Sequence, residues 1–262
     1  MNTPKHSINQ GNDSFQEPKI HGVFSTINET QVGFGHTKKK VSQHVVVFAT
    51  EDEEGWITIR ALNEKNVPSG TAKVISKKNL LNNFLPEPDI YMNQVLPAMR
   101  ELYKSVARGE RHLRNNETYS AEMEFKTALR IDEVNIRATF GLGMSYLQRQ
   151  DTQRGEIVFK RLVKLKGAFE PEHKHMFNEF GIHLRKNKMF TQALKYYARA
   201  SKHSKEDENL FFNMARTYYE AGNSRLALKL IRKALRIRPD FLEAKKLYKH
   251  LQSKIVYKPM KA

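Results

Sequence analysis

Small and bulky residues recur along this chain at a fixed interval near 34 residues. One column of small residues follows intervals of 34, 38 and 34, and four further columns share its register. Such a period is typical of stacked helix pairs, because each pair buries its apolar face only against its neighbours. The five columns are Gly109, Gly143, Gly181 and Ala215; Ala121, Gly155, Ala193 and Ala227; Ala128, Leu162, Ala200 and Ala234; Phe125, Phe159, Tyr197 and Ile231; and His112, Tyr146, Leu184 and Tyr218.

Each column has a physical reason. Small residues let two helix backbones approach closely, and bulky residues fill the space beside them. On these residues the chain resembles the tetratricopeptide repeat family from residue 102 to about 254. The fourth copy fits best, at Phe211, Met214, Ala215, Tyr218, Gly222, Ala227, Ile231, Ala234 and Pro239.

The resemblance implies a mainly α fold, with helix-turn-helix copies stacked into an α-solenoid. A four-residue insertion, Glu170–His173, accounts for the longer interval. The first copy departs from the family at Ser105 and Arg108, where large apolar residues are usual. The copies are expected at residues 102–135, 136–169, 174–207 and 208–241.

The segment after the last copy predicts one more amphipathic helix, over residues 241–255. Its apolar residues recur at steps of three and four, which places them on one face. A repeat array needs a terminal helix with a polar outer face, so we expect a capping helix, with a partner-binding helix as the alternative. The apolar stripe is Leu247, Tyr248, Leu251 and Ile255.

The first 100 residues have a different pattern. Short runs at residues 32–36, 45–50 and 56–60 are rich in β-branched and aromatic residues and predict strands. Ser76 precedes a short helical stretch, Asp89 is a candidate cap for the helix that enters the array, and Pro97 should kink or interrupt that helix. We expect a small β-rich domain here, and the strand count suggests an SH3-like barrel.

Composition completes the domain plan. The 262 residues include no cysteine, which excludes disulfides and thiolate metal sites and fits a reducing compartment. The start of the chain is polar, lacks the apolar core of a signal peptide and predicts a disordered tail. We expect a cytoplasmic, bacterial protein. The expected parts are a tail at 1–18, a β-rich domain at 19–85, a linker and lead-in helix at 86–101, the array with its capping helix at 102–255, and a basic tail at 256–262.

Positive charge is concentrated in the repeats. Residues 1–100 contain 11 Lys/Arg and 10 Asp/Glu, whereas residues 101–262 contain 34 and 18. On the second helix of the last copy, four cations fall at steps of four, three and four, and therefore share one face. Such a face attracts acidic proteins, nucleic acids or anionic lipids, or it simply keeps the protein soluble. This basic face consists of Arg225, Lys229, Arg232 and Arg236.

The resemblance also implies a ligand groove lined by the first helix of each copy. In this family the second, fifth, ninth and twelfth positions chiefly line it. Arginines outnumber Glu110 among them, and Arg and aromatic residues dominate binding energy at interfaces, so we expect an acidic peptide partner with apolar anchors. The carried-over positions are Tyr103, Val106, Glu110 and Leu113; Arg137, Phe140, Met144 and Leu147; His175, Asn178, Ile182 and Arg185; and Asn209, Phe212, Arg216 and Tyr219.

Two patterns suggest chemistry only weakly. Residues 33–40 place glycines ahead of lysines but lack the spacing of a phosphate loop, so a basic hairpin end is favoured. His175, Glu179 and His183 fall four residues apart on one helix, a spacing that could hold a metal or arise by accident. We expect no catalytic residue, no metal and no cofactor. The sequence thus favours a non-enzymatic interaction adaptor over a nucleic-acid- or ribosome-associated protein or a self-assembling component.

Overall fold

The structure of this chain is a computed structural model that describes residues 19–32, 39–170, 173–204 and 206–256. Only the backbone is described at 29–32, 39–41, 203 and 255–256. The tails predicted at 1–18 and after 256, and most of the glycine-lysine segment, lie outside these residues. Two compact units are present: one holds the described residues up to Leu62 together with Ala72–Tyr91, and the other holds Asn63–Thr71 and the described residues from Met92 onward. No helix in the described ranges is long and apolar enough to span a membrane.

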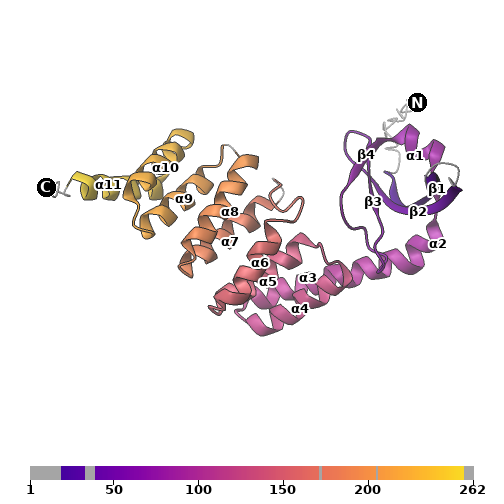
Figure 1. Cartoon of the computed structure of the whole chain (residues 1–262), viewed down its shortest axis with the longest axis horizontal. Coiled ribbons are helices and arrows are strands. Elements are labelled where there is room, and N and C mark those ends of the chain that lie inside the picture. Colours follow the sequence, from indigo (N-terminus) through magenta and orange to yellow (C-terminus); the bar gives the residue numbers. More distant parts are fainter. Residues whose placement is uncertain (1–18, 33–38, 171–172, 205, 257–262) are drawn as a thin grey trace, which may run out of the picture. The chain divides into compact units, whose positions relative to one another are not determined.

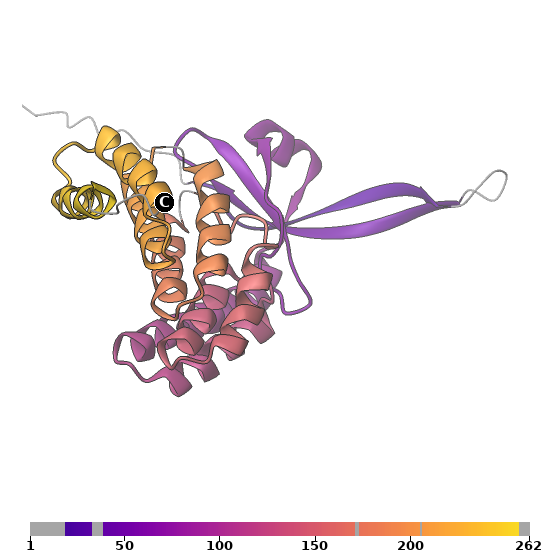
Figure 2. The same cartoon turned by 60° about the vertical axis from the view of Figure 1, so that its left-hand side comes forward.

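The first unit is an antiparallel sheet (Figure 1). Its strands are β1 (His21–Val32), β2 (Lys39–Glu51), β3 (Trp56–Ala61), β4 (Lys73–Ser76) and β5 (Leu85–Pro86), in the order β4-β3-β2-β1-β5. The paired ends of β1 and β2 extend past β3 as a two-stranded ribbon, which projects in Figure 2. In the described part of the chain β4 and β5 do not pair with each other, so the sheet is open and the SH3-like barrel stays a prediction.

The predicted strands at 45–50 and 56–60 are confirmed within β2 and β3. Ile57 and Ile59 are buried and Trp56 and Arg60 are exposed, as period-two alternation requires. Ser76 caps α1 (Lys77–Asn83), because its side chain accepts a hydrogen bond from the Asn79 amide at 3.2 Å. This helix covers the sheet through the buried Leu80.

The helix that enters the array begins differently from the prediction. Asp89 is not its cap: Pro88 takes the first helical position of α2 (Pro88–Ile90), and Glu87 holds the cap position. A π-helical turn, η2 (Tyr91–Val95), then precedes α3 (Leu96–Arg114). Pro97 has no N–H to donate to the turn before it, and this missing donor explains the interruption predicted there.

Paired helices make up most of the second unit (Figure 1), and this confirms the predicted solenoid of four copies. Polar side chains cap several of them: Asn135, Asp151, Asp207 and Asn223 each accept a hydrogen bond from the amide three residues later. The pairs are α3 with α4 (Thr118–Ile131), α5 (Ile136–Gln148) with α6 (Thr152–Leu162), α7 (Lys174–Lys186) with α8 (Phe190–His203), and α9 (Glu208–Glu220) with α10 (Ser224–Ile237).

Close helix contacts explain the small-residue columns. A Cβ built on Gly181 would lie 2.3 Å from the Tyr197 ring, and one on Gly109 would lie 2.8 Å from the Phe125 ring. Both distances are shorter than carbon atoms tolerate, so only glycine allows these pairs to pack. In the first and third copies the glycine thus meets the bulky residue sixteen positions later, whereas a Cβ on Gly143 would meet Phe180 and Val158.

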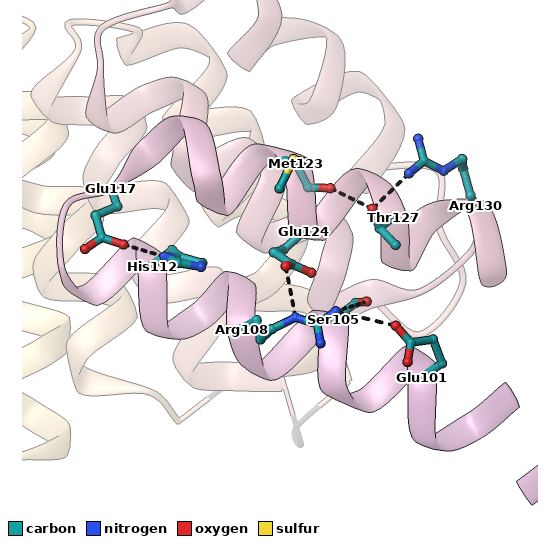
Figure 3. A network of polar contacts seen from close by, with 9 residues as sticks. All are labelled: Glu101, Ser105, Arg108, His112, Glu117, Met123, Glu124, Thr127 and Arg130. Atoms are coloured by element: carbon teal, nitrogen blue, oxygen red, sulfur yellow. Dashed lines mark hydrogen bonds and ion pairs between the residues drawn. The ribbon is translucent and has the colours of Figure 1, made fainter. Parts of the chain in front are cut away.

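The first copy replaces apolar packing with a polar network (Figure 3). Ser105 is fully buried, and Arg108 donates to its hydroxyl oxygen at 3.3 Å. Arg108 also donates from Nε to Glu124 on α4 at 2.9 Å and pairs with Glu101 at 3.4 Å. Ser105 and Arg108, where this copy departs from the family, thus belong to a polar network that joins α3 to α4.

The terminal helix α11 (Leu242–Val256) caps the array, as predicted. Leu251 is fully buried, and Leu247 and Tyr248 pack on the same cluster as Ala227 and Ile231 of α10. The Ile255 side chain lies outside the described residues. Phe241, just before the helix, contributes an aromatic ring to this last core.

Candidate functional site

One helix from every pair joins a continuous row. The first helices contact one another in sequence, α3 with α5, α5 with α7 and α7 with α9. No comparable contacts join successive second helices within the described residues. The closer approach of the first helices places them on the inner side of the stack, where the resemblance predicted a groove.

A pocket of about 740 Å³ opens between α3, α5 and α7, and we call it the central pocket. Its floor is apolar: Phe140 and Met144 are almost fully buried, and Leu113 and Met176 are half-buried. Gly141 also belongs to the lining, and a Cβ built on it would face the Phe125 ring of α4. The lining residues are Glu110, Leu113, Arg114, Arg137, Phe140, Gly141, Met144, Gln148, His173, His175, Met176 and Glu179.

Charged side chains form the rim of the central pocket. Arg137 donates to both carboxylate oxygens of Glu110, with Nη2 at 2.7 and 2.9 Å and Nε at 3.1 Å from them. His175 Nε2 lies 3.6 Å from Glu179 Oε2. Arg114 is exposed and has no carboxylate partner among the described residues. It is therefore the cation of this rim that is free to meet a ligand.

The arginines that suggested an acidic ligand are largely neutralised. Arg137 is held by Glu110, as described. Arg185 is 5% exposed and bonds Glu220, which also lies 3.9 Å from Arg216. Three groove arginines thus pair with carboxylates of the chain itself. The list of groove positions did not reveal this neutralisation of their charge.

Other predicted groove residues are placed differently. Val106 and Leu147 are 4% and 1% exposed and belong to the core between helices. Tyr103, in contrast, is 58% exposed on α3, outside the pocket lining. Asn178 and Ile182 are half-buried on α7.

The groove positions on α9 are covered by the end of the chain. The Phe212 ring lies 4.9 Å from the Phe241 ring. The Tyr219 hydroxyl lies 2.7 Å from His250 Nε2 and accepts a hydrogen bond from Lys254 Nζ at 2.8 Å. Asn209, at the start of the helix, bonds its neighbour Glu208. Phe212 and Tyr219 therefore pack against the capping segment, and neither they nor Asn209 belong to the pocket that Phe140 lines.

Sequence reasoning missed several pocket residues. Arg114 and Gln148 occupy the thirteenth position of their copies, and Met176 and Glu179 the third and sixth. The thirteenth position follows the ninth by four residues, so it lies on the same helix face. That spacing was the available signal. His173 comes from the insertion, which has no counterpart in the repeat.

The candidate metal triplet is not gathered into a site. His183 is half-buried, and burial, then Lys186, lowers its pKa. His175 is exposed and lies near Glu179. Across the described residues no group of three or more His, Cys, Asp or Glu side chains could hold a metal ion.

The predicted basic face is separate from the pocket. Arg225, Lys229, Arg232 and Arg236 are all exposed on α10, a second helix, whereas the pocket is lined by first helices. The two candidate surfaces are therefore independent of each other.

Comparison with known proteins supports the fold. Residues 184–254 match the tetratricopeptide repeat family. Subunit 3 of the anaphase-promoting complex of Schizosaccharomyces pombe is 24% identical over 138 residues, which cover 53% of this chain and 20% of that protein. The chain thus spans about a fifth of that relative's length.

Solved structures share the helical arrangement. The structure titled as a functional characterization of Pseudomonas aeruginosa PilF has a TM-score of 0.51 and 16% identity, over 61% of this chain and 71% of that one. YrrB, titled as a protein with an unusual peptide-binding site, has a TM-score of 0.44 and 23% identity, over 54% and 71%. Only the first is similar enough to support the fold. The tetratricopeptide-repeat match thus covers residues 184–254, and the helix pairs from α3 to α10 share the fold of such repeats.

Proposed function

We propose that this chain is a non-enzymatic interaction adaptor that binds a peptide segment of a partner protein in the central pocket. The observation that carries the proposal is the pocket itself. Its volume of about 740 Å³ falls within the range of roughly 300–1,000 Å³ typical of ligand sites. Three separate helices line it, so a segment that crosses the row would contact several repeats at once.

The lining favours an apolar anchor. Phe140, Met144 and Met176 present an aromatic ring and two flexible thioethers, which adapt to ligand side chains of different shape. Burying one large apolar side chain there contributes about 1.5–3 kcal/mol. The floor is held by packed helices, so little ordering cost opposes binding.

The rim supports one acidic contact. Arg114 is the cation without a carboxylate partner in the described lining, and arginine binds carboxylates through two parallel hydrogen bonds. The ligand proposed here is therefore a segment with one large apolar residue and one acidic group. A strongly acidic ligand is not needed, because Glu110 already occupies Arg137.

Peptide selection tests the proposal. Peptides enriched from a random display library on the immobilised chain would be measured against the double variant Arg114→Glu, Met176→Glu. We expect that variant to weaken binding at least about tenfold, since it reverses the free charge and makes the floor polar. The matched control is Met123→Glu, Arg130→Glu on α4, an exposed methionine and an exposed arginine outside the pocket. Equal affinity in the two variants would contradict the proposal.

A further inference from the structure

The exposed side of α10 carries four cations that no acidic side chain meets. Arg225, Lys229, Arg232 and Arg236 are exposed, and none of them pairs with a carboxylate of the described chain. We call these residues the α10 stripe. On the neighbouring α11, Lys245, Lys246 and Lys249 are exposed as well. The α10 stripe is thus accompanied by further cations on α11, a helix that also carries the exposed Glu243.

Several basic side chains elsewhere in the array pair with carboxylates. Arg108 lies 2.9 Å from Glu124, Arg149 lies 2.5 Å from Glu122, and Lys160 lies 3.3 Å from Glu156. A surface that serves solubility alone usually mixes both signs in this way. The four cations of the α10 stripe have no such carboxylate partner among the described residues, and α10 itself contains no acidic residue.

The spacing within the α10 stripe also has a cost. Like charges three and four residues apart on a helix repel each other and destabilise it. Arg232 contacts the Tyr248 ring at 5.9 Å, but Arg225, Lys229 and Arg236 form no side-chain hydrogen bond, ion pair or ring contact within the described ranges that would offset this repulsion. An external negative charge would remove it.

We infer that the α10 stripe is a second docking surface, independent of the central pocket, and that it binds an acidic α-helical segment of a partner protein. The first and last of the four cations are eleven residue steps apart, or about 16 Å of helix axis at 1.5 Å per residue. Carboxylates at the same steps of four, three and four on a partner helix would face them in register. Charge complementarity of this kind steers association and fixes register.

Other anionic surfaces fit the α10 stripe less well. Single-stranded nucleic acid is bound with the help of exposed aromatic platforms, whereas α10 contains no aromatic residue and Tyr248 beside it is half-buried. A bilayer surface requires apolar side chains that insert beside the charges. The apolar face of α10 is instead buried in the core through Ala227, Ile231 and Ala234.

A pair of designed peptides tests this inference. Both are alanine-glutamine helices with four glutamates. One places the glutamates at steps of four, three and four, and the other distributes them around the helix. Fluorescence anisotropy at low salt would measure their affinity for the full chain. We expect the striped peptide to bind several-fold more tightly than the permuted one, because only its carboxylates share one face.

Matched charge reversals locate the site. Lys229→Glu, Arg236→Glu should weaken binding of the striped peptide about tenfold or more. The control Lys195→Glu, Lys202→Glu on α8 also reverses two exposed cations seven residues apart and should change affinity less than about threefold. Circular dichroism would show that both variants keep their helices.

The other outcomes overturn the inference. No binding, equal binding of the two peptides, or equal losses in the two variants would mean that the α10 stripe is a solvated surface. If an oligonucleotide with four phosphates binds more tightly than the striped peptide and loses binding in Lys229→Glu, Arg236→Glu, the stripe would be a nucleic-acid site instead. Failure of the central pocket would leave these results unchanged, since its test uses other residues.

Discussion

The row of first helices is open at α5 and covered at α9. Phe140 on α5 and Phe212 on α9 occupy the same fifth position of their copies. Phe140 forms the floor of the central pocket, whereas the Phe212 ring packs on the Phe241 ring at 4.9 Å. Position within the repeat therefore predicts which face a residue occupies. Whether that face is open depends on segments outside the repeat.

The segment between α6 and α7 also packs on the array, but unlike the capping segment it leaves the helix row open. Phe169 is buried, with its ring 5.1 Å from the Tyr196 ring and 6.3 Å from the Phe177 ring. His173 then reaches the rim of the central pocket. The irregular segment thus packs beneath α7 and α8 without closing the pocket.

The largest predicted effect concerns the covered part. Phe241→Ala should lower the free energy of unfolding by about 3–5 kcal/mol, because it removes a buried aromatic ring and leaves a cavity beside Phe212. Urea denaturation would measure the loss. Its control is Leu242→Ala, which changes a residue that is 66% exposed and should cost little. Similar losses in the two variants would show that the capping segment is not packed as described.

The next largest effect on stability should come from substitution of Glu122, a buried carboxylate on α4. Burial opposes ionisation of Glu122, but hydrogen bonds from Lys126, Arg149 and Tyr146 outweigh it and lower its pKa from 4.5 to about 2. A lowered pKa stabilises the fold above pH 4.5, and that contribution is lost as pH falls toward 2. Glu122→Gln should therefore cost about 1–3 kcal/mol at neutral pH.

The pH dependence of that cost is the check. The stability difference between wild type and Glu122→Gln should shrink as pH falls from 4.5, where the carboxylate of the unfolded chain takes up a proton, toward 2, where that of the folded chain does. Urea denaturation at several pH values would follow it. A difference that stays constant with pH would mean that the ionised carboxylate does not join α4 to α5.

A smaller effect should come from the glycine in the pocket floor. A Cβ on Gly141 would lie 2.1 Å from the Phe125 ring, so Gly141→Ala forces that ring to move. Overpacking costs about 1–3 kcal/mol, and the better helix propensity of alanine returns about 1 kcal/mol. We expect a net loss of about 1 kcal/mol by thermal denaturation. A net gain would show that the floor has room to relax.

The smallest effect on stability concerns the pocket rim. Glu110→Gln removes a partly exposed ion pair with Arg137, which is worth at most about 1 kcal/mol. Its effect on binding should be larger and opposite in sign, because Arg137 becomes free to meet an acidic ligand. Isothermal titration with an acidic peptide selected on the chain should show several-fold tighter binding. Unchanged or weaker binding would mean that Arg137 does not face the ligand.

The repeat period predicted the helix pairs well because close packing restricts the size of the residue at fixed positions of each copy. Only small residues fit beside the Phe125 and Tyr197 rings, so the columns survive even where single copies depart from the family. The strand β1 was missed over most of its length, since its outer half contains Asn and Glu, which have low strand propensity. Its main support is pairing with β2.

The charge of the groove could not be read from a list of positions. Arg185 and Glu220 are 35 residues apart and meet only because α7 and α9 are neighbours. Glu110 and Arg137 were both recognised as groove positions, but their bidentate contact depends on side-chain geometry. The sequence thus located the positive charge correctly on α10 and overestimated it in the groove.

Hydrogen exchange with a selected peptide tests the central claim most directly. Amide exchange of the full chain would be measured by mass spectrometry with and without the peptide. The account predicts slower exchange at residues 110–114, 137–148 and 173–179, which line the central pocket, and no change at 209–219 or 225–236. Protection confined to α9, α10 or α11 would contradict a binding site in the central pocket.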